Sequence, residues 1–275
     1  MKKRRSLYYV NIITTHSPLK LALFMFSPQL HLEVDDGEMA TSLMAKRRVP
    51  SHSWLLFRSF RSDSALEALR KASEAKIPNL VLYNYPSFSG AFSALFAHLY
   101  HSRLNLPCLV LPFSSAVPFR VNDVCIEGLR TCYFLDFLGP RGFASELSKR
   151  TSCKIIGFDH RKRSRSLILY KEDWDENLLF HVNLEKSSSV AVYEYFSSKL
   201  TEICSDDGHN TKMLNPKDGE RVEMVLKYIE DVDLRRWSLA DSKAFNIGIN
   251  EWRSKLNCIM NPLMYDQAYS SELFC

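Results

Sequence analysis

The sequence predicts an α/β fold with a mainly parallel sheet flanked by helices. Short apolar runs that are typical of buried strands alternate with stretches in which apolar residues recur at helical spacing. Strands separated by helices form βαβ units, and such units place their strands in parallel. A chain of 275 residues with 46% apolar content is long enough for one or two packed domains.

Strands and helices are expected in alternation on the basis of apolar runs and helical periodicity. The strands are apolar runs bounded by turn-forming residues, at positions 79–83, 107–111, 131–137 and 154–158. The helices are expected at positions 64–75, 91–100, 143–149, 187–200 and 222–229. The polar stretch 204–219 contains Gly, Asn and Pro residues and is predicted to be a surface loop.

Composition excludes several classes of protein. No window approaches the roughly 18–20 continuous apolar residues that a membrane span needs, so no membrane association is predicted. The seven cysteines are odd in number and include no C-x-x-C pair. A zinc site or a disulfide framework is therefore poorly supported, and ordinary thiols in a reducing compartment are the better interpretation.

The positive charge is concentrated at the start of the chain. Residues 1–62 hold ten Lys or Arg against four Asp or Glu, whereas the remainder is close to neutral. From Met44 to Ser62 the sequence is rich in Arg and Ser and free of acidic residues, which is typical of an organelle transit peptide. We therefore predict a disordered leader at 1–62, with the true start at Met44 and a mitochondrial location. A chloroplast or cytosolic location, or a plain basic tail, is the alternative.

Polar residues stand where two predicted neighbouring strands end. Asp136 lies at the end of one apolar run, and Asp159 and His160 follow another. In parallel sheets, ligands bind outside the carboxyl ends of the strands. Carboxylate and imidazole groups are the ligands that a divalent metal needs, so the sequence predicts a metal site at this edge.

Four motifs follow one another along the chain. They are the sequences NYPSFSGAFSAL at 84–95, FLDFLGP at 134–140, DH at 159–160 followed by NLEKS at 183–187, and YIEDVDL at 228–234. In this order, over roughly residues 78–267, they resemble the DHH phosphoesterases, most closely a plant-type branch. This superfamily includes RecJ-type exonucleases, nanoRNase/pAp phosphatases and exopolyphosphatase-like proteins.

The resemblance implies a hydrolase that uses a pair of cations, usually manganese, to clamp a phosphate and activate a water. Carried over by position, Asp159 and His160 are the catalytic residues. The implied phosphate-binding residues are Arg161 and Ser187. The implied metal ligands are Asp136, His160 and Asp231, with Asp233 as the alternative to Asp231.

The same comparison implies that four family positions are degenerate. The first-motif His and Asp are replaced by Asn84 and Ser89, the second His of the signature by Arg161, and a later Asp by Asn183. Asn and Ser are neutral oxygen donors that cannot offset a dication's charge as a carboxylate does. Arg161 adds a fixed cation. The pattern predicts one Mn²⁺ ion at most.

The predicted organisation is a leader at 1–62, a DHH-like α/β domain at 63–267 and a truncated tail at 268–275. The family usually continues into a second, substrate-binding domain, which is predicted to be absent because the sequence at 261–267 resembles the end of the first domain.

The sequence is compatible with three functions. The first is a weakly active or inactive DHH-like homologue, a pseudoenzyme. The second is a single-metal phosphoesterase acting on short nucleotides or phosphate esters. The third is a nucleic-acid-binding module that uses the basic run 161–165, although a solvated basic loop is the more common meaning of such a run. The expected partners are thus a small phosphorylated nucleotide or a short nucleic acid.

Overall fold

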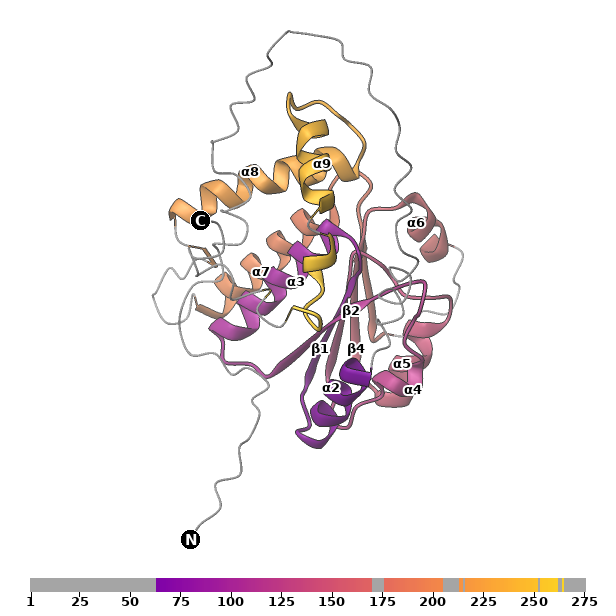
Figure 1. Cartoon of the computed structure of the whole chain (residues 1–275). Helices are drawn as coiled ribbons and strands as arrows, with labels where there is room; N and C mark the ends of the chain where they lie inside the picture. The colour runs from indigo at the N-terminus through magenta and orange to yellow at the C-terminus, as the bar shows by residue number, and fades with distance from the viewer. Residues whose placement is uncertain are drawn as a thin grey trace, which may run out of the picture.

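A computed structural model describes residues 63–169, 176–204, 213–214, 216–251, 253–261 and 264. The predicted leader at 1–62, including Met44, and the predicted tail at 268–275 lie outside these residues. Within them, five parallel strands form one sheet in the order β2-β1-β3-β4-β5, and helices cover both of its faces (Figure 1). The predicted α/β class with a parallel sheet is confirmed.

The strands have nearly the bounds that their apolar runs predict. They are β1 (Asn79–Asn84), β2 (Cys108–Phe113), β3 (Thr131–Leu135), β4 (Lys154–Asp159) and β5 (Leu178–Val182). The fifth strand was not predicted, because β5 lies at the edge of the sheet and only its first residue is fully buried. The third strand was predicted to reach Phe137, but it ends at Leu135 because Asp136 has a φ of 66° and turns the chain away.

The helices in the described part of the chain precede, connect or follow the strands. They are α2 (Asp63–Glu74), α3 (Phe88–Arg103), α4 (Val121–Val124), α5 (Phe143–Thr151), α6 (Lys162–Leu169), α7 (Ser188–Cys204), α8 (Pro216–Asp233) and α9 (Ser242–Glu251), with a short 3-10 helix η3 (Arg253–Leu256). The predicted loop at 204–219 is wrong at its end, because α8 already begins at Pro216, a residue favoured in the first turn of a helix. The remainder of that stretch lies mostly outside the described residues.

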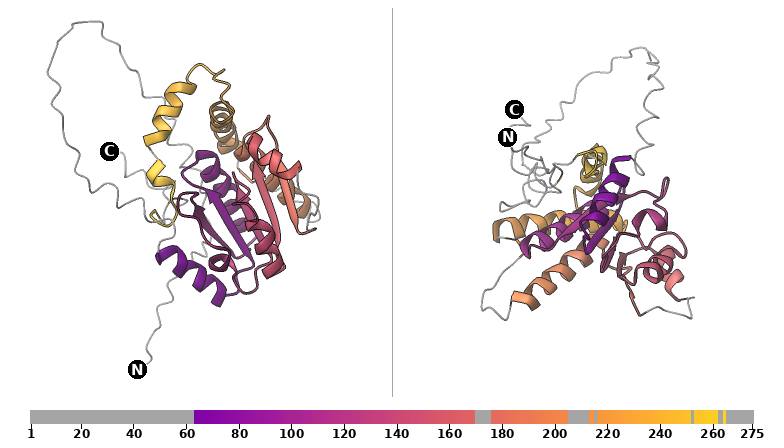
Figure 2. Two further views of the ribbon diagram at one scale, coloured as in Figure 1. Left: turned by 90° about the vertical axis from the view of Figure 1, so that its right-hand side faces the viewer. Right: turned by 90° about the horizontal axis from the view of Figure 1, so that it is seen from below.

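Alternate residues of the central strands contribute to two separate hydrophobic cores. Val81 and Tyr83 of β1 pack with α3, α7 and α8, whereas Leu80 and Leu82 pack with α2, α4 and α5 on the opposite face. Figure 2 shows helices on both sides of the sheet. A parallel sheet buried on both faces produces continuous apolar strands, which explains why these runs were visible in the sequence.

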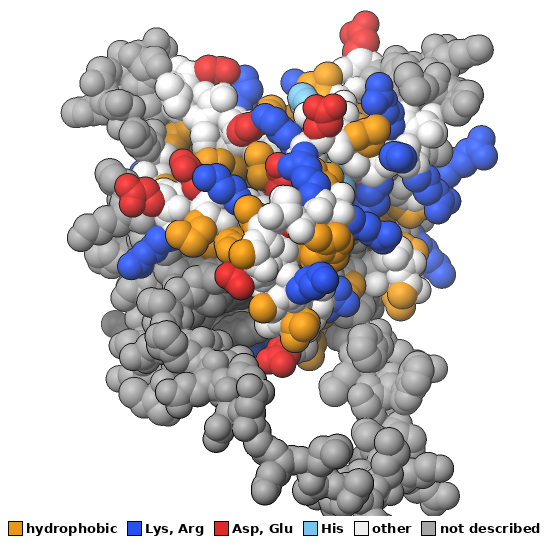
Figure 3. Space-filling model, turned by 90° about the horizontal axis from the view of Figure 1, so that it is seen from above, with side chains coloured by type: hydrophobic (Ala, Val, Ile, Leu, Met, Phe, Trp, Pro, Cys, Tyr) orange, Lys and Arg blue, Asp and Glu red, His pale blue; other side chains and the backbone are white. Residues whose placement is uncertain are grey.

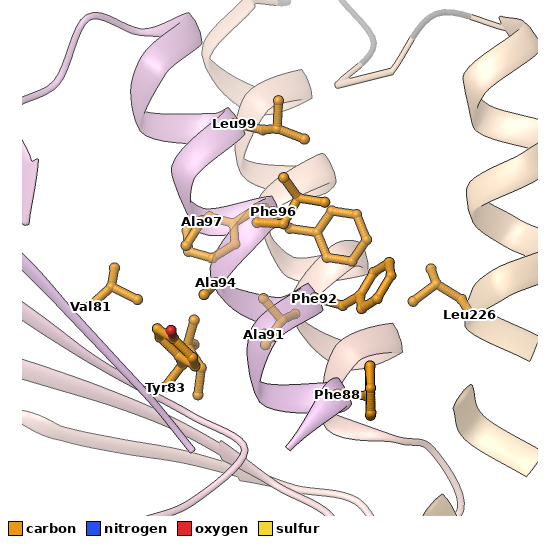
Figure 4. Close-up of a cluster of buried hydrophobic side chains, with 14 of the residues drawn as sticks. Val81, Tyr83, Phe88, Ala91, Phe92, Ala94, Phe96, Ala97, Leu99 and Leu226 are labelled. Atoms are coloured by element: carbon orange, nitrogen blue, oxygen red, sulfur yellow. The ribbon is translucent and has the colours of Figure 1, made fainter. Parts of the chain in front are cut away.

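Helix α3 is the central helix of the first core. It is buried along almost its whole length. Figure 4 shows Ala94 and Ala97 on the side of Val81 and Tyr83, whereas Phe92 points toward Leu226 of α8. Small residues against the sheet and aromatic residues toward the outer helices let α3 lie close to β1 and still fill the space beyond it.

The last described segment is fastened to the middle of the sheet. The Tyr83 hydroxyl donates to the carbonyl of Leu256 at 2.7 Å and accepts from the backbone N–H of Cys258 at 3.1 Å. Residues that are more than 170 positions apart in the sequence are thereby joined. None of the helices in the described residues is long and apolar enough to span a membrane.

Candidate functional site

The carboxyl ends of β3 and β4 bring together three of the predicted site residues. Asp136 directly follows β3, Asp159 ends β4, and the two strands pair in register from Thr131 with Lys154 onward. Ligand atoms of Asp136, Asp159 and His160 all lie within 4.8 Å of one another. The structure therefore places these three residues in one cluster at the edge where the sequence predicted a metal site.

The guanidinium group of Arg161 bridges the two aspartates. Its NH1 nitrogen donates to Asp159 Oδ1 and to the backbone carbonyl of Asp136, each at 2.7 Å, and its NH2 nitrogen donates to Asp136 Oδ2 at 3.1 Å. The cationic group thus contacts both carboxylates, as a bound metal would. The Arg161 side chain is 41% exposed, whereas the Asp136 side chain is fully buried.

Asp136 is held through one of its two carboxylate oxygens. Oδ2 accepts hydrogen bonds from Asn84 Nδ2 at 2.9 Å and Ser87 Oγ at 2.6 Å, in addition to the bond from Arg161. Oδ1 is buried and has no hydrogen-bond partner, although His160 Nδ1 lies within ion-pair distance at 3.3 Å. Burial alone would raise the pKa of Asp136, but the contact with His160 and the charge of Arg161 outweigh it and hold this pKa well below its usual range.

Gly90 of α3 is required by the packing beneath this carboxylate. A Cβ atom added to Gly90 would lie 2.2 Å from the backbone oxygen of Asn84, a distance that no real contact allows. Ser87 caps the same helix by accepting from the Gly90 backbone N–H. The close approach of α3 to β1 therefore sets the positions of both Asn84 and Ser87, the two neutral donors to Asp136.

Asp159 is engaged on both carboxylate oxygens. Oδ1 accepts from the backbone N–H of His160 at 2.8 Å and from that of Arg161 at 3.3 Å, besides the guanidinium of Arg161. Oδ2 accepts from the hydroxyl of Ser164. These donors come from the residues that lead into α6 and from its first turn, so Asp159 stabilises the start of that helix, where a negative charge is favourable.

His160 lies between the cluster and the start of α7. Its Nδ1 is 3.0 Å from Ser188 Oγ and 3.3 Å from Asp136 Oδ1. Burial would lower the pKa of His160, but the neighbouring carboxylates of Asp136 and Asp233 reverse that effect and raise it. A protonated imidazole would balance part of the negative charge of the cluster.

Asp231, the predicted third metal ligand, is not part of this cluster. Its Oδ1 accepts from the backbone N–H of Ser238 at 2.9 Å and from the Ser238 hydroxyl. Its Oδ2 accepts from the backbone N–H of Leu239 at 3.3 Å and from the hydroxyl of Ser242. Burial would raise the pKa of Asp231, but these donors lower it to about 2. The carboxylate fastens the turn between α8 and α9.

The alternative residue, Asp233, lies within electrostatic range of the cluster. Burial and the charge of Asp136 raise the pKa of Asp233 to about 6, against the opposing effect of His160. The Oδ2 atom of Asp233 is buried and has no hydrogen-bond partner. Of the two alternatives that the sequence left open, Asp233 is the one within electrostatic range of Asp136 and His160.

The remaining predicted residues have structural contacts. Ser89 Oγ accepts from the backbone N–H of Ser189 at 3.0 Å and so joins the first turns of α3 and α7. Ser187, predicted to bind phosphate, is fully buried, and its hydroxyl is 3.0 Å from that of Ser189. Asn183 Oδ1 accepts from the backbone N–H of Glu185 and shapes the turn after β5. As placed, Ser187 offers no accessible hydroxyl to a phosphate.

The cluster does not fit a pair of metal ions in this arrangement. A carboxylate ligand needs a free oxygen lone pair directed at the ion. Both oxygens of Asp159 are already engaged by protein donors, and of Asp136 only Oδ1 is unpartnered. The donor types suit one divalent ion, but the guanidinium of Arg161 already contacts two of the three groups.

Three serines that support the site were not predicted. Ser87, Ser164 and Ser188 provide the hydroxyls that contact Asp136, Asp159 and His160 respectively. Ser87 carries a signal that sequence reasoning could use, since a Ser before a helical pattern is a frequent N-cap. No comparable signal identifies Ser164 or Ser188, because their partners are selected by the tertiary fold.

Comparison with known proteins does not identify a family. The chain matches no protein-family model and no curated protein sequence. The resemblance to DHH phosphoesterases therefore stays a prediction carried by the four ordered motifs, while the parallel α/β architecture stands on the structure itself.

Proposed function

We propose that this chain is a DHH-like phosphoesterase homologue in which the cation of Arg161 takes the place of a catalytic metal, so that it has little or no hydrolytic activity. The observation that carries the proposal is the bridge from one guanidinium group to both Asp136 and Asp159. An arginine side chain is covalently attached and keeps its charge, so it neutralises the carboxylates without depending on metal supply.

The chemistry of the site supports the proposal. Two-metal hydrolysis needs carboxylates that hold the ions and an open position at which a water is activated. Arg161 can neither lower the pKa of a bound water as a metal does nor serve as a general base, because it stays protonated at physiological pH. The saturation of Asp159 by Ser164 and backbone donors also favours a structural role for that residue.

A second candidate is a phosphoesterase with a single metal, which Mn²⁺ would suit. It is favoured by the two buried carboxylate oxygens without hydrogen-bond partners, Asp136 Oδ1 and Asp233 Oδ2. A cation bound at Asp136 Oδ1 would satisfy that atom and would lie close to His160, whose Nδ1 is 3.3 Å from it. In this candidate Arg161 remains beside the ion, and the exposed part of its guanidinium is available to hold a phosphate oxygen.

Calorimetric titration with Mn²⁺ separates the two candidates. For the wild-type chain we expect no binding below millimolar concentration and no turnover of bis-p-nitrophenyl phosphate. In the Arg161→Ala variant the two carboxylates lose their cation, so we expect a measurable Mn²⁺ site and a melting temperature that rises when the metal is added. Arg163→Ala is the matched control, because it removes a neighbouring exposed arginine and leaves the bridge intact.

The opposite result would support the single-metal enzyme. Micromolar Mn²⁺ binding to the wild-type chain, together with phosphodiester turnover that Asp136→Asn abolishes, would contradict the substitution of a metal by Arg161. The Asp136→Asn variant keeps the side-chain shape and one carbonyl oxygen, so its folding is checked by the same thermal melt.

A further inference from the structure

We propose that the exposed basic side chains of α6 and of the loop after β3 form a surface that binds the phosphate backbone of a single-stranded nucleic acid. The basic surface consists of Arg141, Lys162, Arg163 and Arg165, all of which are exposed. The basic surface is separate from the carboxylate cluster, since none of these four residues contributes to that cluster.

The fold brings these four residues to one edge of the sheet. Arg141 lies in the loop that follows β3, and α6 follows β4, the next strand in the sheet. The two segments lie close together, because Phe137 of that loop forms a bridge with Phe158 of β4 and Arg161 donates to the carbonyl of Asp136. Figure 3 looks down on this edge, and Lys and Arg side chains gather on its right, the side on which Figure 1 shows α6.

The charge of the basic surface is not neutralised by ion pairs in the described residues. Arg70, Lys76, Lys186, Lys199 and Arg236 elsewhere each lie within 4.0 Å of a glutamate carboxylate. The four residues of the basic surface have no such pair among the residues that the structure describes. The sequences 137–145 and 160–169, which carry them, contain no acidic residue.

Arg161 is excluded from the basic surface on geometric grounds. It belongs to the same basic run, but its guanidinium is bonded to Asp136 and Asp159. Its charge is therefore already compensated by these two carboxylates. The structure divides the run 161–165 into one cation that is bonded to carboxylates and three cations without an ion pair among the described residues.

The spacing and chemistry of the surface favour a chain of phosphates. Lys162, Arg163 and Arg165 lie within one turn of a helix, which rises about 5 Å per turn, so several cations meet the ligand close together. Three of the four side chains are arginines, whose planar donors match phosphate oxygens. A flexible single strand can follow such a surface with successive phosphates, and its affinity then rests on backbone charge.

The test measures binding of a fluorescein-labelled oligouridine of twelve nucleotides to the full chain by fluorescence anisotropy. Four phosphate contacts predict a slope of about −2.8 in a plot of log affinity against log salt concentration, at about −0.7 per contact. Affinity should then fall about fifty-fold between 50 and 200 mM salt. A wild-type chain with no binding at 50 mM salt would overturn the proposal.

The RNA affinity of the variant Lys162→Ala/Arg163→Ala/Arg165→Ala should fall only about three-fold between 50 and 200 mM salt, because one phosphate contact remains. The control Arg221→Ala/Lys227→Ala/Lys243→Ala removes the same charge from exposed positions on α8 and α9 and should bind as the wild type does. If both triple variants weaken binding equally, the proposal fails, because net charge and not this surface is responsible. Thermal melts confirm that each variant is folded.

Two further arms test the identity of the ligand and the influence of neighbouring acids. Vesicles of phosphatidylcholine with 30% phosphatidylserine should not cosediment with the chain, and binding to vesicles without binding to RNA would overturn the proposal. Acidic residues follow α6 in the sequence, at 172, 173, 175 and 176. If RNA binds only after Glu172→Gln/Asp173→Asn/Asp175→Asn/Glu176→Gln, the proposal is wrong for the native chain.

Discussion

The carboxyl edge of the sheet and the turn between α8 and α9 each hold a buried aspartate that the sequence presented as a metal ligand. Asp231 in the turn is satisfied entirely by neutral donors, two hydroxyls and two backbone N–H groups, from residues seven to eleven positions away. Asp136 at the sheet edge takes its donors from residues 25 to 52 positions away, and one of them is a cation.

The difference separates two uses of a buried carboxylate. Neutral donors from nearby residues hold the Asp231 carboxylate in a structural role, in which it stabilises a turn. Distant donors assemble around Asp136 only when β1, β3 and β4 are in place, and they leave Oδ1 without a partner. A buried and unsatisfied oxygen beside other titratable groups is a feature of functional sites.

The largest effect is expected where the backbone approaches most closely at the sheet edge. Gly90→Ala should lower the free energy of unfolding by about 3 kcal/mol, because the added Cβ meets the backbone of Asn84. Gly248→Ala on α9 is the matched control, since nothing lies within 4 Å of its added Cβ. That change should stabilise the helix by up to about 1 kcal/mol. Equal results in chemical denaturation would contradict the close packing of α3 against β1.

The next effect tests the role of Asp231 in the turn. Asp231→Ala should lower the melting temperature by about 5 °C, because it leaves the donors of Ser238, Leu239 and Ser242 unpaired. Asp231→Asn keeps one acceptor oxygen, so its melting temperature should fall by less than that of Asp231→Ala. If added Mn²⁺ raised the melting temperature of the wild type but not that of Asp231→Ala, Asp231 would have a metal role that the geometry does not support.

A pH-dependent effect should mark Asp233 as a member of the sheet-edge cluster. Its pKa is raised to about 6, so the folded state binds a proton more tightly than the unfolded state does. The contribution of Asp233 to stability is therefore complete below its unfolded value near 3.8 and is lost as pH rises through 6. Asp233→Asn cannot ionise, and it should be more stable than the wild type at pH 8 by about 1–2 kcal/mol.

The difference in the free energy of unfolding between Asp233→Asn and the wild type should become small near pH 4, because the carboxyl of Asp233 is then protonated in the folded state and, with an unfolded pKa near 3.8, partly protonated in the unfolded state. Thermal melts at pH 4, 6 and 8 measure it. Glu220→Gln, at an exposed position on α8, should show no such trend. A constant difference across this range would separate Asp233 from the cluster.

The smallest effect concerns a single hydroxyl. Ser164→Ala removes the donor to Asp159 Oδ2 and should reduce the free energy of unfolding by about 1 kcal/mol. Ser166→Ala, at an exposed position on the same helix, should change it by less than about 0.5 kcal/mol. If the two variants are equally stable, Asp159 does not depend on Ser164, and its lone pair is available to a cation.

Local sequence patterns determined the layers of this protein. Apolar runs identified four of the five strands, because strands buried on both faces are apolar throughout. The edge strand β5 was not predicted, since only Leu178 in it is buried. The carboxyl-end rule for parallel sheets also brought Asp136, Asp159 and His160 together correctly, because it depends only on strand direction and order.

Only the tertiary structure decided what these residues contact. No spacing in the sequence indicates that Arg161 bridges two carboxylates, that Asp231 faces its own turn, or that Asp233 is within electrostatic range of Asp136. Hydrogen bonds and ion pairs act over about 3 Å, so they depend on side-chain directions that helix packing sets. The sequence alone thus determined which residues meet at the sheet edge, and the packing of α3, α6 and α7 decided which of them remain open to a ligand.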